Sequence, residues 1–84
     1  MNMETDIHPK LIELFRTIFL ELSSAEVGQI EKARREALES WDSANQLLLI
    51  TMLEDEYKIQ IPDDELAEMD SFASVSVIVS HLIQ

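Results

Sequence analysis

Cysteine is absent from this sequence. A chain without cysteine can form no disulfide, no thiolate metal site and no catalytic thiol of its own. Any thiol chemistry would therefore have to come from an attached group, which would act as a cofactor.

Basic residues are scarce. Lysine and arginine number 6 against 17 aspartates and glutamates, which gives a formal net charge of −11. This charge repels phosphate groups, so it argues against nucleic acids and anionic membranes as partners. We expect a protein partner with a basic surface instead.

A long hydrophobic run is also missing. The longest apolar stretch, Leu47 to Leu53, is too short to span a bilayer and contains Thr51. The first ten residues, MNMETDIHPK, have acids and a proline where a secretory signal has a basic head and an apolar core. We therefore expect no signal peptide and a cytoplasmic location. Residues 1–84 make one domain, which is too small to enclose a deep enzyme pocket.

Hydrophobic spacing predicts helices over most of the chain, at about residues 6–21, 43–57, 63–68 and 71–83. The first is expected to begin at Asp6. Its apolar residues at helical spacing are Ile7, Leu11, Leu14, Phe15, Ile18 and Leu22. The short third helix follows Pro62, because acids suit a helix N-terminus, and Leu66 and Met69 anchor it.

The last helix is expected to begin at Asp70 or Ser71. Its apolar face comprises Phe72, Val75, Ile78, Val79 and Leu82. Residues 57–61 alternate as a strand would, but no second segment of comparable pattern offers a partner, so no sheet is predicted. The predicted fold is all-α, a small four-helix bundle.

The stretch WDSANQLLLITMLEDEYKIQIP, residues 41–62, is the most informative part of the chain. Ser43 stands at the head of an apolar helix and, with Gln46, fits the spacing of a capping box. Asp42 can itself accept backbone N–H bonds at the helix start. The helix is therefore predicted to begin at Asp42 or Ser43.

This predicted helix is more apolar than one buried face requires. We expect Leu47, Ile50 and either Leu53 or Tyr57 to face inward, while Leu48, Leu49 and Met52 widen the apolar stripe. The surplus is explained by a deeply packed central helix, by a partner contact or by a cleft that shelters a bound chain.

The order of residues here resembles the acyl and peptidyl carrier proteins. Their signature is an Asp-Ser-Leu step before an amphipathic helix that ends in acids, an aromatic residue and Ile-Pro. The matching residues are Asp42, Ser43, Leu47, Leu53, Glu54, Glu56, Tyr57, Ile61 and Pro62. The resemblance implies a carrier-type four-helix bundle with a short third helix. It also implies that the ambiguous segment from Ser23 to Ser40 is a long first loop holding a short helical turn.

In that family the serine carries a 4′-phosphopantetheine arm, so the resemblance implies that Ser43 is the attachment site, next to Asp42. A phosphopantetheinyl transferase, using Mg²⁺, would attach the arm, whose thiol holds acyl or aminoacyl thioesters. The implied role is in fatty-acid, polyketide or related specialised biosynthesis. The implied partners are acyl-transferring or synthase enzymes with basic docking surfaces, and the carrier is expected to be a monomer.

Partner contacts are expected at Ala44, Leu48, Glu54, Asp55 and Glu56. Ala44 departs from the pattern, because a leucine usually follows the serine. This departure keeps an alternative open: an unmodified acidic helical adaptor with the carrier fold, which binds a protein partner through the helix at residues 43–57.

No intrinsic catalysis is expected. Neither His8 nor His81 is placed near Ser43 by the sequence, and no Gly-x-Ser-x-Gly turn is present. The histidines also lack neighbouring ligands at metal-binding spacing, so no metal site is predicted.

Overall fold

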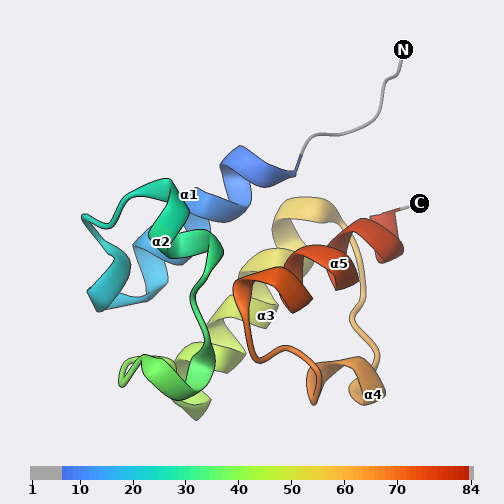
Figure 1. Cartoon of the computed structure of the whole chain (residues 1–84). Coiled ribbons are helices and arrows are strands. Elements are labelled where there is room, and N and C mark those ends of the chain that lie inside the picture. The colour runs from blue at the N-terminus through green and yellow to red at the C-terminus, as the bar shows by residue number, and fades with distance from the viewer. Residues whose placement is uncertain (1–6, 84) are drawn as a thin grey trace.

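Residues 7–83 are described by this computed structural model, and their regular structure is entirely helical (Figure 1). Five α-helices form in this range: α1 (His8–Ile18), α2 (Val27–Glu31), α3 (Ser43–Tyr57), α4 (Asp63–Leu66) and α5 (Phe72–Ile83). Two short 3-10 helices, η1 (Leu20–Leu22) and η2 (Arg35–Ala37), lie in the first connection. The described residues form no strand, and the all-α prediction is confirmed.

The core lies between α1, α3 and α5. Figure 1 shows α1 and α2 on one side of the molecule and α4 on the other, with α3 and α5 between them. The side chains with almost no exposed surface are Leu11, Phe15, Phe19, Ile30, Leu49, Leu53, Met69, Val75 and Val79. The predicted inner faces of the first and last helices are confirmed, except that Leu82 is only partly buried.

The first helix is shorter than predicted. α1 ends at Ile18 because Phe19 adopts an extended conformation, with φ −102° and ψ 116°, and the chain continues as η1. The guanidinium of Arg16 donates to the carbonyl of Ala25 at 2.8 Å, which holds the chain folded back against α1. The predicted cap Asp6 lies outside the described residues.

The segment between Ser23 and Ser40 is a long connection with a short helical turn, as predicted. Its helix, α2, has a capping box in which the backbone N–H of Glu26 donates to the Gln29 side chain at 3.0 Å. In the same connection Arg34 forms an exposed ion pair with Glu36, 3.3 Å from Nε to Oε2.

Two backbone hydrogen bonds tie this connection to the start of α5. Arg35 N–H donates to the Asp70 carbonyl at 2.8 Å, and Phe72 N–H donates to the Ala33 carbonyl at 3.0 Å. These bonds fix η2, which begins at Arg35, relative to the start of α5, and η2 forms part of the candidate site.

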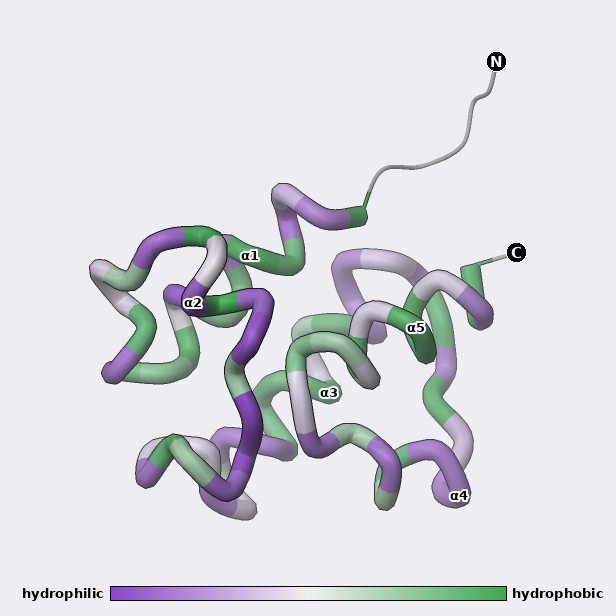
Figure 2. Tube along the Cα trace, in the orientation of Figure 1, coloured by the Kyte–Doolittle hydropathy of each residue, from purple (hydrophilic) through white to green (hydrophobic). Residues whose placement is uncertain are grey.

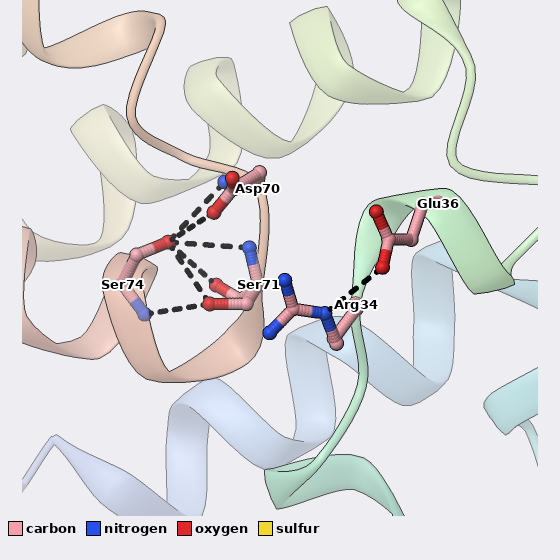
Figure 3. A network of polar contacts seen from close by, with 5 residues as sticks. All are labelled: Arg34, Glu36, Asp70, Ser71 and Ser74. Carbon is pink, nitrogen blue, oxygen red and sulfur yellow. Dashed lines mark hydrogen bonds and ion pairs between the residues drawn. The ribbon is translucent and has the colours of Figure 1, made fainter.

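A serine pair caps α5, as Figure 3 shows. Ser74 N–H donates to Ser71 Oγ at 3.0 Å, and Ser71 N–H donates to Ser74 Oγ at 3.2 Å. The predicted start of the last helix is confirmed, and Ser71 is its cap. The predicted helix at 63–68 is shorter: α4 ends at Leu66, and Met69 N–H closes a tighter turn onto the Leu66 carbonyl at 3.2 Å.

Candidate functional site

The start of α3 is capped by Asp42. Its carboxylate accepts a hydrogen bond from the Asn45 N–H at 2.9 Å, and its carbonyl accepts from the Gln46 N–H at 2.8 Å. The predicted bounds of this helix, 43–57, are confirmed, and so is the capping role of Asp42. The predicted capping box between Ser43 and Gln46 is wrong, because the Gln46 side chain is buried and points into the core.

Ser43 is the first residue of α3 and its side chain is exposed. Since Asp42 provides the cap, the Ser43 hydroxyl makes no hydrogen bond within residues 7–83. The first-turn N–H groups of Ser43 and Ala44 have no acceptor inside the helix. An exposed hydroxyl therefore lies beside unpaired backbone donors at the positive end of a fifteen-residue helix.

Trp41 holds this helix start against the core. The indole is 3% exposed, and its ring lies 4.8 Å from the ring of Phe19 and 5.4 Å from that of Phe15, centroid to centroid. Its Nε1–H donates to Oε1 of Gln46, whose amide in turn donates to the Met69 carbonyl at 3.4 Å. Trp41 and Gln46 are thus held in the core before and after Asp42 and Ser43. The side chains of Asp42 and Ser43 themselves reach solvent.

A second set of bonds fixes the preceding loop. Ser40 donates its backbone N–H, at 3.2 Å, and its hydroxyl to the carboxylate of Glu21. The hydroxyl bond is the main cause that lowers the pKa of Glu21. The Asn45 side chain donates to the Ser40 carbonyl at 2.7 Å, which links this loop to the first turn of α3.

An open hollow of about 430 Å³ lies beside Ser43. It is lined by Arg35, Ser43, Gln46, Leu47, Ile50, Asp63, Leu66 and Ala67. Arg35 is the only lysine or arginine among these lining residues, and its Nε also donates to the Trp41 carbonyl at 3.3 Å. The hollow thus joins α3, α4 and η2 around the serine and offers one positive charge near it.

The exposed face of α3 differs from the predicted one. Leu47 was expected to face the core, but it is 65% exposed, and the buried positions are Gln46, Leu49 and Leu53. The reason is that Gln46 takes the inward position by bonding Trp41, which turns its neighbour Leu47 outward. Ile50 is half-buried and packs against the core.

Two of the predicted partner-binding residues share this outer region. Ala44 is exposed, and Leu48 is 44% exposed. With Leu47 they give the N-terminal half of α3 an apolar outer surface, so the surplus of apolar residues is not all core.

The predicted acids lie at the other end of the helix. Glu54 lies eleven positions after Ser43, which places the two residues about 16 Å apart along the helix axis. Asp55 and Glu56 are exposed, whereas the Glu54 carboxylate accepts a hydrogen bond from the Ile61 N–H at 3.0 Å and supports the turn after α3. The acid that shares the hollow with Ser43 is Asp63.

The histidines lie away from the serine. His8 pairs with Glu31 at 2.7 Å, and His81 lines a different hollow, between α4 and α5. No cluster of three or more histidines and acids suited to a metal ion occurs in the described residues. None of the helices in the described range is long and apolar enough to cross a membrane.

Sequence reasoning missed Arg35, Asp63 and Leu66 as neighbours of Ser43. The sequence does not single out Arg35, and it assigns Asp63 only to the start of a helix. Nothing in their local sequence indicates the proximity. Arg35 is held by bonds distant in sequence, from its N–H to the Asp70 carbonyl and from its Nε to the Trp41 carbonyl.

No protein-family model matches the chain, and comparisons with curated proteins and with solved structures found no significant match.

Proposed function

We propose that this chain is an acyl or peptidyl carrier protein whose Ser43 is the attachment site for 4′-phosphopantetheine. The proposal rests on one observation at the start of α3. Asp42 caps the helix, and the Ser43 hydroxyl is left exposed without a hydrogen bond in the described structure. A serine that served only as a helix cap would hold its hydroxyl against a backbone N–H.

The arrangement of helices supports the same proposal. We assign α1, α3, α4 and α5 to the four helices that the carrier resemblance implies, with α4 as the short third helix. The extra helix α2 lies in the long first connection, where a helical turn was expected.

The surroundings of Ser43 suit a phosphodiester. The unpaired N–H groups of the first turn and the helix dipole favour negative charge on the serine oxygen. Arg35 lines the same hollow, together with one acid, Asp63. The helix end projects the serine outward, so an attached arm would be free to reach partner enzymes.

Attachment requires a partner enzyme. The Ser43 hydroxyl makes no hydrogen bond to a base within the described residues, so the transferase supplies the base that accepts its proton. The Ser43 oxygen attacks the phosphorus of coenzyme A that bears the pantetheine, and the bond to the nucleotide phosphate breaks. Adenosine 3′,5′-bisphosphate leaves, and the phosphodiester remains on the serine. The thiol of the arm then supplies the thioester chemistry that a chain without cysteine lacks.

Partner docking is assigned to the outer surface of α3. Ala44, Leu47 and Leu48 provide apolar contact close to the attachment point, and Asp55 and Glu56 provide negative charge at the far end. This pattern fits partners with basic docking surfaces, because opposite charge steers the encounter while apolar contact holds the complex.

A second candidate is the unmodified adaptor, and the exposure of Leu47 and Leu48 favours it as much as it favours a carrier. An adaptor would use the same α3 surface to bind a protein partner without any group on Ser43.

Intact mass separates the two functions. After incubation with coenzyme A, Mg²⁺ and a broad-specificity phosphopantetheinyl transferase, the wild-type chain should gain the mass of one phosphopantetheine. Ser43→Ala should gain nothing while keeping its helical circular dichroism, since Asp42 still caps α3. A wild-type chain that stays unmodified by every transferase tested would favour the adaptor.

A further inference from the structure

A second hollow, separate from the Ser43 hollow, lies between α4 and α5. It has a volume of about 610 Å³ and is lined by Asp64, Glu65, Glu68, Ser74, Val77, Ile78 and His81. We call it the α4–α5 groove. Its lining residues come from the segment around α4 and from α5. Figure 2 colours the segment around α4 as mostly hydrophilic and α5 as more hydrophobic.

The α5 wall is a continuous stripe. Ser74, Val77, Ile78 and His81 follow the i, i+3, i+4, i+7 spacing, so they share one helix face. Val77 is 68% exposed, whereas the other valines of α5, Val75 and Val79, are fully buried. The Ser74 hydroxyl is already occupied by the α5 cap (Figure 3), which leaves Val77 as the main open contact.

The α4 wall is acidic and unneutralised. The carboxylates of Asp64, Glu65 and Glu68 make no ion pair or side-chain hydrogen bond within residues 7–83. Of the described residues that line the groove, none is a lysine or arginine, and no lysine or arginine follows Lys58 in the sequence. Like charges at this spacing repel one another, so a bound cationic group would relieve the repulsion.

We propose that the α4–α5 groove binds an amphipathic basic helix of a partner protein. One apolar side chain of that helix lies over Val77, and flanking lysines or arginines face Asp64, Glu65 and Glu68. A helix fits because its ridges pack alongside the straight stripe of α5. A second copy of this chain does not fit, because its net charge of −11 would be brought against the same acids.

The groove and the Ser43 hollow use different faces of the segment around α4. Asp63, Leu66 and Ala67 line the hollow, whereas Asp64, Glu65 and Glu68 line the groove. Binding at the groove therefore does not depend on Ser43, and it stands whether or not the proposed carrier function is correct.

The test is a titration of the ¹⁵N-labelled full chain with a synthetic helix of roughly four turns that carries leucines on one face and flanking lysines. Amide shifts should concentrate at residues 64–68 and 74–81. Val77→Ala should weaken binding about tenfold, since it removes two buried carbons from the contact. The double variant Glu65→Gln, Glu68→Gln should bind the synthetic helix more weakly, and its affinity should depend less on salt concentration than that of the wild type.

Matched controls are available in the chain. Val27→Ala changes an exposed valine on α2, Glu36→Gln an exposed acid on η2, and Ser43→Ala the proposed attachment site; all three should bind as wild type does. A peptide with alanines in place of the leucines should bind at least tenfold more weakly.

Four outcomes would overturn the proposal. In the first, the alanine peptide binds as tightly as the leucine peptide; in the second, Val77→Ala and Val27→Ala lose the same affinity. In the third, the amide shifts caused by the peptide centre on α3. In the fourth, amides of residues 74–81 shift with protein concentration when no peptide is present. The last would assign the groove to a second copy of this chain.

Discussion

Replacing the buried Gln46 should destabilise the fold, even though the replacement is more hydrophobic. Gln46→Leu leaves the Nε1–H of Trp41 without an acceptor in an environment where the indole is 3% exposed. A buried donor left unpaired costs about 1–3 kcal/mol. The bond from Gln46 to the Met69 carbonyl is long, at 3.4 Å, and adds little. For a domain of this size the expected loss corresponds to a fall in Tm of roughly 4–24 °C.

Urea and thermal unfolding followed by circular dichroism measure this change, with Gln60→Leu as the control. Gln60 is exposed and its side chain makes no hydrogen bond within residues 7–83, so its replacement should change stability by no more than about 0.5 kcal/mol. A double-mutant cycle with Trp41→Phe isolates the pair, and the coupling between positions 41 and 46 should reach about 1 kcal/mol. A Gln46→Leu chain as stable as wild type, or a coupling near zero, would refute the reasoning.

Three further predictions concern docking, specificity and alkaline stability. The double variant Asp55→Lys, Glu56→Lys should slow arm attachment by a transferase with a basic docking surface, and its attachment rate should approach that of the wild type as the salt concentration rises. Attachment rates that change with neither the substitutions nor the salt would place docking elsewhere. Ala44→Leu should speed attachment by a generic transferase by roughly tenfold, because it adds an apolar contact beside Ser43; unchanged kinetics with every transferase would show that residue 44 lies outside the contact. Burial, and secondarily Glu56, raises the pKa of Tyr57 from its usual 10.0 to about 12, so the folded state favours the neutral phenol. The stability that this preference contributes is complete below pH 10 and is lost as the pH rises through 12. Absorbance titration should give two different midpoints for tyrosinate formation, a higher one in the folded chain and a lower one in the urea-unfolded chain.

The bounds of α3 could be predicted because several local signals agree. Asp42 offers a cap, the apolar run follows, and the acids and Ile61-Pro62 close the segment. The predicted first helix was too long because no local signal marks its end. The hydrophobic spacing continues through Leu22, yet the backbone is extended at Phe19.

The burial pattern within α3 could not be read from hydropathy. A polar residue, Gln46, takes a core position because a tryptophan five residues earlier offers its indole N–H, while Leu47 turns to solvent. The site follows the same rule. Ser43 and Asp42 stand out in the local sequence. Arg35, in contrast, is held by a long-range backbone bond to the Asp70 carbonyl and by a bond from its Nε to the Trp41 carbonyl, which local sequence does not reveal.

Localising the attached group by tandem mass spectrometry tests the central claim most directly. After the transferase reaction, proteolysis should yield one modified peptide, and fragmentation should place a phosphodiester-linked pantetheine on Ser43. The exposed serines Ser23, Ser24 and Ser80 serve as internal controls and should stay unmodified. The group on another serine, or a mass gain that survives in Ser43→Ala, would contradict the account.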